Sequence, residues 1–449
     1  MPAEARVRAY AVVRGALEDG AYVDRALQAQ ARGLDRRDRS LAKRLAYGAI
    51  QRRGTLDHLI ATLAQRPVEQ LDGHVRAALT LGMYELLYTS GAPDRAVVSD
   101  AVELAKETGR GGHGLVNAVL RRAAGEGQSL LAALSDDTPE RAAVKHSHPL
   151  WLARLWWREL GAERARALMA ADNEPGEQAL RANTLIADAP TLARALAAGE
   201  PAPGPGAVAA HPDDELPEAL VLAGPFDAHA SRLWREGAFL AQSRAAMLVS
   251  RVLAPRPGER TLDLCAAPGG KSTHLAALMA DGGEVVAIER DRRRAGALAR
   301  TAQRLHASCI RIEVADAGLP RDREAPFDRV LVDPPCSGLG TLQARPDLRW
   351  RMAPERIEEL AREQARILAA GARAVRPGGV LVYSTCTISR SENERQIAAF
   401  LDAHPDFGLD DLRAEWPSHS NPRSPETVLT LPDRDRTAGF FIARLRREG

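Results

Sequence analysis

Apolar residues recur at spacings of three and four along the first part of the chain, for example in RVRAYAVVRGAL and VRAALTLGMYELLYT. This spacing gathers apolar side chains on one face of each helix, and it predicts an all-helical domain over residues 1–125. The helical pattern continues over residues 126–236 but is interrupted by LAAGEPAPGPGAVAA at residues 196–210. Since proline and glycine interrupt regular elements, we expect a surface loop or linker there, within a small and mainly helical middle region.

The pattern changes after Phe239, where short apolar runs alternate with helical segments. The runs are TLDLC, EVVAIE, IRIEVAD, DRVLVD and GGVLVYST. Apolar runs of this length are typical of strands in a parallel sheet that is covered on both faces. Their alternation with helices predicts an α/β domain with a doubly wound sheet over residues 237–449.

The composition favours a helix-rich globular chain but identifies no partner. The chain has 449 residues, more than one ordinary core holds, and 45% of them are apolar. Its 61 basic residues nearly cancel its 59 acidic ones, so no overall charge indicates nucleic-acid binding. A local exception is RGLDRRDRSLAKR, residues 32–44, which has six basic residues and two aspartates. This segment is either a solvated loop and helix start, which the charge run alone favours, or a patch that contacts phosphates.

The cysteines and the apolar segments of the sequence predict a cytoplasmic protein. Cys265, Cys309, Cys336 and Cys386 have neither the paired spacing of a disulfide framework nor a zinc pattern, so we expect reduced thiols in the cytoplasm. The N-terminus lacks the apolar core of a signal peptide, and no run of about 18 apolar residues predicts a membrane span. HSHP, residues 146–149, has no cysteine or carboxylate cluster beside it, and we interpret it as a helix-entry loop rather than a metal site.

Glycines and acids gather at the predicted carboxyl edge of the sheet. The first strand ends in DLCAAPGGK, where Gly269 and Gly270 let the backbone approach a ligand, although an ordinary tight turn is the alternative. Glu289 ends the second strand, 20 residues after Gly269, the spacing at which an acid reaches a ribose diol. Asp316 ends the third strand and is interpreted as an acceptor for an adenine amino group, although strand-end aspartates also form turns. Since neither a G-x-G-x-x-G fingerprint nor a P-loop is present, the expected cofactor is S-adenosyl-L-methionine.

Two cysteines follow neighbouring strands of the predicted sheet. Cys336, in VDPPCSGLG, follows the fourth strand, and Cys386, in VYSTC, follows the fifth, so both thiols are expected over one pocket. Carbon 5 of a pyrimidine is a poor nucleophile, and a thiolate must add to carbon 6 before carbon 5 accepts a methyl group. Asp333 is the carboxyl group placed to hydrogen-bond cytosine N3, and Lys271 is placed to hold a carboxylate and lower a thiol pKa. The other two cysteines are interpreted as small buried side chains.

Three ordered motifs, LDLCAAPGGK, VDPPCSGLGT followed by RPDLRW, and VYSTCTISRSENE, resemble those of the S-adenosylmethionine-dependent RNA 5-methylcytosine methyltransferases of the RsmB family, also called Fmu or Sun. The first 125 or so residues resemble the NusB-type helical RNA-binding domain that precedes the catalytic domain in this family. The resemblance implies a Rossmann-like catalytic domain in which Cys386 is the nucleophile and Cys336 assists release of the methylated product. It implies cofactor contacts at these positions: Cys265, Ala266, Ala267, Pro268, Gly269, Gly270, Lys271, Glu289, Asp316 and Asp333.

The resemblance also implies a substrate, a cytosine in small-subunit (16S) ribosomal RNA that is modified before the subunit is assembled. A stacked base could not reach Cys386, so we expect a single-stranded or flipped-out cytosine. The helical domain and the middle region would position the RNA, and we expect a monomer that needs no metal. The alternatives are a methyltransferase acting on transfer RNA and a non-catalytic RNA-binding assembly factor, although such a factor is expected to lose Cys386 or the Gly-Gly loop.

Two segments depart from the family pattern. FLAQSRAAM, residues 239–247, has Ser243 and Arg244 where acids usually follow the glutamine, and Ala438 stands where an aspartate is usual. These positions lie outside the motifs that carry the thiols. We therefore expect them to change local RNA or loop contacts and not the chemistry.

Overall fold

The computed structural model describes residues 2–106, 111–200, 204–321 and 326–449. The chain divides into two compact units: a helical unit, Met1–Pro175 with Leu342–Ala353, and an α/β unit, Gly176–Thr341 with Pro354–Gly449. This division falls at neither of the boundaries expected from the sequence, which lie after residues 125 and 236. The segment Leu342–Ala353, which the sequence places in the catalytic domain, belongs to the helical unit.

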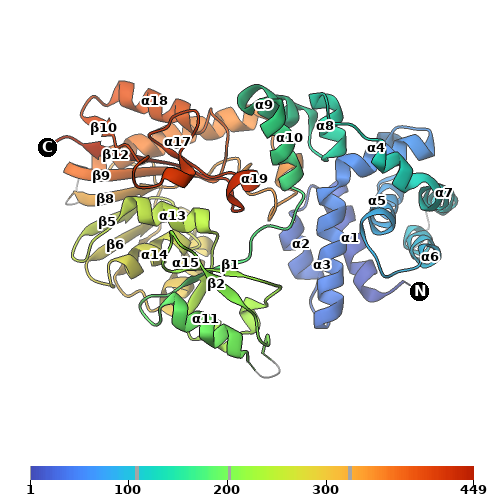
Figure 1. Ribbon diagram of the computed structural model, residues 1–449, viewed down its shortest axis with the longest axis horizontal. Coiled ribbons are helices and arrows are strands. Elements are labelled where there is room, and N and C mark those ends of the chain that lie inside the picture. The colour runs from blue at the N-terminus through green and yellow to red at the C-terminus, as the bar shows by residue number, and fades with distance from the viewer. Residues whose placement is uncertain (1, 107–110, 201–203, 322–325) are drawn as a thin grey trace. The chain divides into compact units, whose positions relative to one another are not determined.

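The helical unit consists of helices packed around an apolar core, as the sequence predicts (Figure 1). Leu45, Leu56, Leu79 and Leu120 come from four different helices and are fully buried in this core. The helical spacing of apolar residues therefore reflects one buried face on each helix. The helices are α1 (Glu4–Glu18), α2 (Val23–Gln30), α3 (Arg36–Gln51), α4 (Arg53–Ala64), η1 (Val68–Gln70), α5 (Gly73–Tyr88), α6 (Asp94–Lys106), α7 (His113–Ala132), α8 (Pro139–Lys145), α9 (Leu150–Leu160), α10 (Ala162–Ala171) and α16 (Leu348–Arg351).

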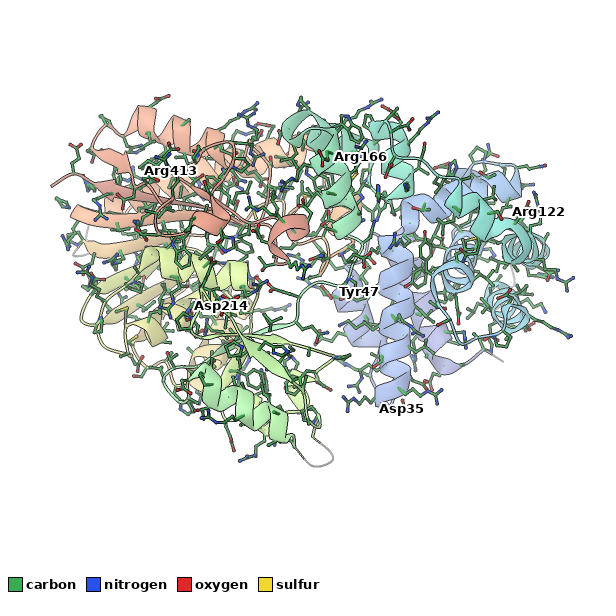
Figure 2. All side chains as sticks on the ribbon, in the orientation of Figure 1. Asp35, Tyr47, Arg122, Arg166, Asp214 and Arg413 are labelled. Carbon is green, nitrogen blue, oxygen red and sulfur yellow. The ribbon has the colours of Figure 1, made fainter. Side chains whose placement is uncertain are left out.

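The basic segment at residues 32–44 contains the start of α3. Asp35, labelled in Figure 2 at the end of this helix, is its N-cap. The carboxylate of Asp35 accepts a hydrogen bond from the backbone N–H of Asp38 at 2.8 Å. Such a cap satisfies one of the N–H groups that a helix start leaves without a partner. Asp35 therefore has a local structural role at the start of α3.

The late segment that joins the helical unit is anchored there by two large side chains. The guanidinium of Arg349 is fully buried and donates to the backbone carbonyls of Ser147 and Asp172 at 3.0 and 3.1 Å. The indole N–H of Trp350 donates to the Ile50 carbonyl at 2.9 Å. These contacts join residues that are far apart in the sequence, and no local pattern of residues reveals them.

The α/β unit begins with a four-stranded antiparallel sheet in the order β2-β3-β1-β4. Leu180 of β1 pairs with Leu220 on one side and with Ala241 on the other. The sequence misses this sheet, because strands of three or four residues are too short to show a period. The elements are β1 (Ala179–Ala182), α11 (Ala189–Ala198), β2 (Ala210–Pro212), β3 (Ala219–Leu222), η2 (Ala228–Ala230), α12 (Arg232–Arg235) and β4 (Phe239–Ala241).

A larger sheet, in the order β10-β12-β9-β8-β5-β6-β7 with β11 paired to β12, contains the strands expected from the sequence. The neighbours from β9 to β7 run parallel, which confirms the doubly wound α/β domain. β10, β11 and β12 pair antiparallel on one side of them and are not among the expected strands. The strands are β5 (Arg260–Asp263), β6 (Glu284–Ile288), β7 (Ile310–Glu313), β8 (Phe327–Val332), β9 (Val375–Thr385), β10 (Phe407–Leu409), β11 (Val428–Leu429) and β12 (Phe441–Arg447).

Helices cover both faces of the larger sheet, with α13, α14 and α15 on one face and α17 and α18 on the other (Figure 1). Ligands of such sheets bind outside the carboxyl ends of the parallel strands, where the covering helices leave an edge open. No helix in the described parts of the chain is long and apolar enough to cross a membrane. The helices are α13 (Arg244–Leu253), α14 (Gly270–Leu278), α15 (Arg292–Arg304), α17 (Pro354–Ala374), α18 (Glu394–Ala403), η3 (Pro417–His419) and α19 (Pro432–Asp435).

Candidate active site

A tight loop follows β5 at the carboxyl edge of the larger sheet. The loop ends at Gly269, and α14 begins at Gly270. Gly269 has φ = +104°, and a Cβ there would lie 2.7 Å from Leu298 Cδ1, so the turn requires glycine. The backbone N–H of Ala266 donates to the Ile288 carbonyl at 2.9 Å, which ties the loop to the end of β6. The first turn of α14 thus presents backbone N–H groups at this edge.

The remaining loop residues are held by their neighbours. The backbone N–H of Cys265 donates to Asp263 Oδ1 at 3.4 Å, and burial raises the pKa of the Cys265 thiol. The Ala267 carbonyl accepts a hydrogen bond from Arg294 at 2.8 Å, and the peptide bond between Ala267 and Pro268 is cis. The loop is therefore fixed mainly through its backbone, and its side chains are small or enclosed.

Asp263, the last residue of β5, is a buried acid next to this loop. Ser272 Oγ donates to its Oδ2 at 2.7 Å. Burial nevertheless raises the pKa of Asp263 to about 6, since the Ser272 hydroxyl and the Cys265 N–H only partly replace the water that a carboxylate loses.

The two acids assigned to the cofactor differ in exposure. Glu289 follows β6 and is 4% exposed, and its carboxylate accepts from the Asp291 N–H at 2.9 Å and lies 3.4 Å from the Arg294 guanidinium. Asp316 lies beyond the end of β7, and its side chain is 44% exposed. A hydrogen bond from Arg366 at 2.8 Å lowers the pKa of Asp316. Glu289 is thus enclosed, whereas Asp316 is a surface carboxylate whose ligand would have to share it with an arginine.

The two thiols that the sequence places at one edge are in contact. Val332 at the end of β8 pairs with Tyr383 of the parallel strand β9, so the residues that follow reach the same edge. Cys336 Sγ lies 3.2 Å from Cys386 Sγ, although 50 positions separate the two residues in the sequence. The structure therefore brings both cysteines into one site.

Three of the four thiols are kept protonated by their surroundings. The hydrogen bond with Cys386 and burial raise the pKa of Cys336 well above its ordinary value. Burial raises the pKa of Cys265, and burial together with a hydrogen bond to Asp281 raises the pKa of Cys309 to about 12. Because the thiolate is the nucleophilic form, these surroundings disfavour attack by Cys265 and Cys309.

Asp333 is fixed by a cation and a hydroxyl. Lys271 Nζ lies 2.7 Å from Asp333 Oδ2, and Ser384 Oγ donates to Oδ1 at 2.7 Å. Burial alone would lower the pKa of Lys271, but the charge and hydrogen bond of Asp333 outweigh it, and the net pKa is raised. The same ammonium lies 5.2 Å from the centre of the Phe440 ring. Lys271 and Asp333 therefore form an ion pair at this edge of the sheet.

The loop that carries Cys336 is joined to Cys386 through the backbone. The Gly340 N–H donates to the Cys386 carbonyl at 3.0 Å, and the Gly340 carbonyl accepts from the Gly439 N–H at 2.7 Å. A Cβ on Gly340 would lie 1.9 Å from the Gly439 oxygen, so this approach requires glycine. Three segments that are distant in the sequence are thereby fixed beside the thiols.

The residues that depart from the family pattern have structural contacts. Ser243 caps α13, and the guanidinium of Arg244 pairs with Glu177 at 2.8 Å and with Asp213 at 2.9 Å. Ala438 packs, partly buried, against the core of the α/β unit. Arg244 thus finds acidic partners elsewhere in the chain, at a position where an acid is usual.

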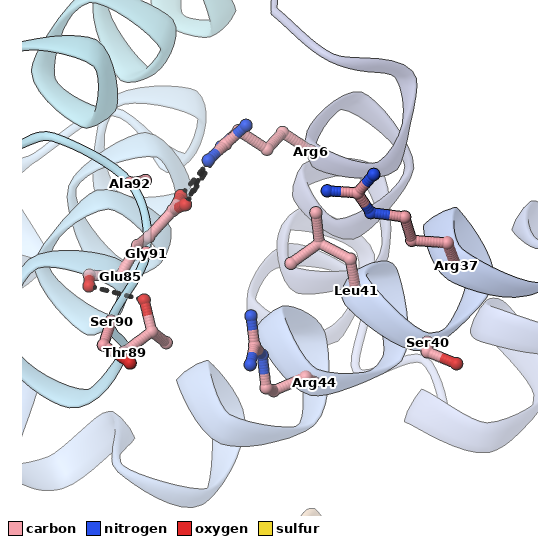
Figure 3. A pocket seen from close by; sticks show the side chains of 10 residues that line it. All are labelled: Arg6, Arg37, Ser40, Leu41, Arg44, Glu85, Thr89, Ser90, Gly91 and Ala92. Carbon is pink, nitrogen blue, oxygen red and sulfur yellow. Dashed lines mark hydrogen bonds and ion pairs between the residues drawn. The ribbon is translucent and has the colours of Figure 1, made fainter.

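Arginines of the helical unit line a separate cavity of about 570 Å³ (Figure 3). Arg37, Ser40 and Arg44 come from α3, and Arg6 comes from α1. Arg6 Nε donates to Glu85 at 3.0 Å, whereas no ion pair joins Arg37 or Arg44 to an acid among the described residues. Part of the basic segment at residues 32–44 therefore lines a cavity.

Two buried polar residues immediately before α18 are not among the site residues expected from the sequence. Glu392 and Asn393 are fully buried, and each hydrogen-bonds to a loop that carries one of the cysteines. Buried acids are rare unless they are hydrogen-bonded. The acidic run SENE in the third motif is the sequence feature that indicates them.

Known families match three segments of the chain. Residues 3–125 match the NusB family, residues 148–229 match the ferredoxin-like domain of RsmF/B-like methyltransferases, and residues 250–446 match the 16S rRNA methyltransferase RsmB/F family. A probable ribosomal RNA small subunit methyltransferase B of Synechocystis is 36% identical over 99% of both chains. The chain belongs to the RsmB/F family. The resemblance inferred from the three motifs is therefore confirmed.

Other members and solved structures agree with this membership. The ribosomal RNA small subunit methyltransferase B of Thermus thermophilus is 36% identical, over 92% of this chain and 89% of the relative. The crystal structure of PH0851 is 27% identical and covers 100% of this chain and 99% of its own, with a TM-score of 0.80. A methyltransferase homologue from Pyrococcus horikoshii is also 27% identical and covers 70% of this chain and 100% of its own, with a TM-score of 0.60. The catalytic unit thus has the Rossmann-like fold of RsmB/F methyltransferases.

Proposed function

We propose that this chain transfers a methyl group from S-adenosylmethionine to carbon 5 of a cytosine in small-subunit ribosomal RNA. The proposal depends above all on the 3.2 Å contact between Cys336 Sγ and Cys386 Sγ, at the sheet edge that also holds the ion pair of Asp333 with Lys271. Covalent attack on a pyrimidine requires a thiol, and activation of the base requires a group that hydrogen-bonds or protonates it. The names of the relatives, ribosomal RNA small subunit methyltransferase B, support the choice of RNA.

Cys386 is the proposed nucleophile. Its thiolate adds to carbon 6 of the cytosine, and the electron pair of the 5,6 double bond is delocalised toward N3. Asp333 gives a proton to N3 as charge develops there and takes it back when the methylated cytosine is released, and Lys271 keeps this carboxyl group in place. Because its pKa is raised, Cys336 keeps its proton while Cys386 attacks.

Release follows methylation of carbon 5, for which bound S-adenosylmethionine supplies the methyl group. A base removes the proton from carbon 5, the 5,6 double bond forms again, and the bond between carbon 6 and sulfur breaks. Cys386 leaves as the thiolate, and Cys336, in contact with it, is the proposed aid to this step.

The donors at the edge of the sheet are suited to S-adenosylmethionine. Glu289 offers a buried carboxylate to ribose hydroxyls, and the start of α14 offers backbone N–H groups. A Cβ on Gly270 would make only ordinary contacts, with Leu240 at 3.8 Å and with Gln242 at 3.9 Å. We assign the cofactor contacts to residues 265–271 together with Glu289, Asp316 and Asp333.

The basic cavity of the helical unit supports an RNA partner. Arg37 and Arg44 would neutralise phosphates there, and their replacement by glutamate should weaken RNA binding and reduce its dependence on salt concentration. Arg122→Glu makes the same change of charge on α7, and it is not among the residues that line the cavity. Equal effects of all three substitutions would count against a specific role for the cavity.

The thiol roles make opposite predictions that test the proposal. Cys386→Ala should abolish methyl transfer from labelled cofactor and form no RNA adduct, whereas Cys336→Ala should accumulate a covalent protein–RNA adduct. If Cys336→Ala instead abolished formation of the bond, the two roles would be reversed.

The RNA substrate is tested by bisulfite sequencing of a deletion strain. One methylcytosine should disappear from small-subunit ribosomal RNA. Loss from transfer RNA instead would establish the alternative substrate, and no loss from either RNA would contradict the proposed activity.

A further inference from the structure

Two adjacent residues, Glu392 and Asn393, connect the loops of the two thiols. Both side chains are fully buried immediately before α18. Burying a carboxylate costs free energy unless hydrogen bonds replace its water, so its partners indicate why it is retained.

Glu392 holds the loop of Cys336. The backbone N–H of Ser337 donates to Glu392 Oε1 at 2.8 Å, and the Ser337 hydroxyl donates to Oε2 at 2.5 Å. Gln364 Nε2 donates to Glu392 Oε1 and to the Pro335 carbonyl, both at 3.0 Å. The residues on both sides of Cys336 are therefore fixed by one carboxylate and its amide partner.

Asn393 holds the loop of Cys386 in a similar way. The Thr385 hydroxyl donates to Asn393 Oδ1 at 2.5 Å, and Asn393 Nδ2 donates to the Thr387 carbonyl at 2.9 Å. These two threonines are the residues on either side of Cys386. Consecutive residues of one backbone thus fix the two loops against each other.

We propose that Glu392 and Asn393 are positioning residues that set the distance between the two thiols, Glu392 acting on release through Cys336 and Asn393 acting on attack through Cys386. The inference rests on the thiol roles proposed above. The hydrogen bonds of Glu392 and Asn393 go to the residues that flank each cysteine, and each side chain acts through those residues. The two substitutions therefore have different kinetic consequences, which a general loss of stability would not produce.

Glu392→Ala should reproduce the phenotype of Cys336→Ala. Methylation in a single turnover is retained, steady-state turnover falls, and the denaturant-resistant RNA adduct rises at least about tenfold over wild type, because a lost hydrogen bond to a charged group shifts an equilibrium by that much. Glu392→Gln keeps one carbonyl oxygen for the Ser337 N–H and should restore part of the turnover. If Glu392→Ala does not fold, Ser337→Ala is a smaller change that removes the 2.5 Å bond to Glu392, together with the 2.8 Å contact of the same hydroxyl with Thr387.

Asn393→Ala should have the opposite effect. The rate of adduct formation falls about tenfold or more because Cys386 is misplaced, and no adduct accumulates. In a Cys336→Ala background, Asn393→Ala should slow the appearance of the adduct more than Glu392→Ala does, because Glu392 is linked to the Cys386 loop through the 2.8 Å contact of the Ser337 hydroxyl with Thr387 Oγ1.

Two buried residues of the α/β unit are matched controls. Glu218 accepts from Arg251 Nε at 3.1 Å, and Asn183 Nδ2 donates to the Gly237 and Leu305 carbonyls at 3.0 and 2.8 Å. Their alanine variants should lower the unfolding midpoint without changing the adduct formed per folded molecule.

Each outcome either supports or overturns the proposal. If Glu392→Ala or Asn393→Ala changes stability as the control variants do and leaves the adduct unchanged, the positioning role is wrong while the proposed function stands. If Cys336→Ala forms no adduct, the thiol roles fail, and the positioning role fails with them.

Discussion

Gly340 lies where two backbone segments of the α/β unit meet. A Cβ at this position would lie 1.9 Å from the Gly439 oxygen, 2.6 Å from its carbonyl carbon and 2.8 Å from its Cα. All three are backbone atoms, so no rotation of a side chain relieves the contact. Real Cβ contacts do not fall under 3.0 Å, and the Gly340→Ala variant must therefore separate the segments by at least 1.1 Å.

A movement of this size affects both hydrogen bonds of Gly340, the 2.7 Å bond from Gly439 and the 3.0 Å bond to the Cys386 carbonyl. A lost hydrogen bond costs about 1 kcal/mol, and overpacking costs about 1–3 kcal/mol, so the free energy of unfolding should fall by about 2–4 kcal/mol. A catalytic group displaced by about 1 Å loses up to about 100-fold in rate. Methyl transfer per folded molecule should therefore fall by about 10- to 100-fold.

Urea unfolding gives the stability, and transfer of a labelled methyl group, normalised to the folded fraction, gives the rate. Gly296→Ala is the matched control, since a Cβ there would meet only Arg300 Nη1 at 3.6 Å within α15. Alanine in a helix interior should raise the stability by up to about 1 kcal/mol. If Gly340→Ala behaves as Gly296→Ala does in both assays, the reasoning from the close backbone approach is refuted.

Asp263 has a pKa of about 6, above its ordinary 3.8, because it is buried. Between these pH values the folded state holds a proton that the unfolded state has lost, so the free energy of unfolding should fall by about 3 kcal/mol as the pH rises through this window. Asp263→Asn should remove this part of the pH dependence. If the urea midpoint of the wild type does not change between pH 3.8 and 6, the prediction for Asp263 is wrong. Cys309, with a pKa of about 12, should react with iodoacetamide at pH 8 far more slowly than free cysteine does, and the reaction should be faster in the Asp281→Ala variant. Mass spectrometry measures both rates. If Cys309 reacts as fast as free cysteine, or equally fast in the wild type and in Asp281→Ala, its pKa is not raised by burial and Asp281. Arg349→Ala leaves buried carbonyls without donors and should destabilise the helical unit by about 3 kcal/mol or more, measured by urea unfolding, whereas a change under about 1 kcal/mol would show that the anchor is dispensable.

The sequence predicts the parallel strands because both faces of the sheet are covered, so each strand is a continuous apolar run. It does not predict β12, FIARLRR, in which arginine interrupts the apolar pattern. Arg444 is only partly exposed there, and its charge is satisfied by Asp410 at 2.8 Å and by Glu415. These partners lie about 30 positions away in the sequence. A partner at that distance is visible only after folding, and the same holds for the insertion of Arg349 into the helical unit.

In the candidate site, too, some features can be predicted from the sequence and others become visible only in the folded chain. Cys336 and Cys386 can be placed at one edge from the order of parallel strands alone, because strand ends fix backbone positions. The partners of Asp316 depend on the direction of an arginine from α17, and those of Glu392 on a serine 55 positions away. The sequence motifs contain Glu392 without showing what it touches.

The contact between the two sulfur atoms also makes a prediction about their titration. Two thiolates 3.2 Å apart would repel each other, so only one of them ionises readily, and this coupling contributes to the raised pKa of Cys336. Asn393→Ala keeps the charge of Glu392 but frees the loop of Cys386. If Asn393 sets the separation, the sulfurs move apart in this variant and the pKa of Cys336 falls toward its ordinary value. Thiolate absorbance against pH, compared with Cys386→Ala as the limit of no coupling, measures the shift, and a pKa that stays at the wild-type value would show that the separation does not depend on Asn393.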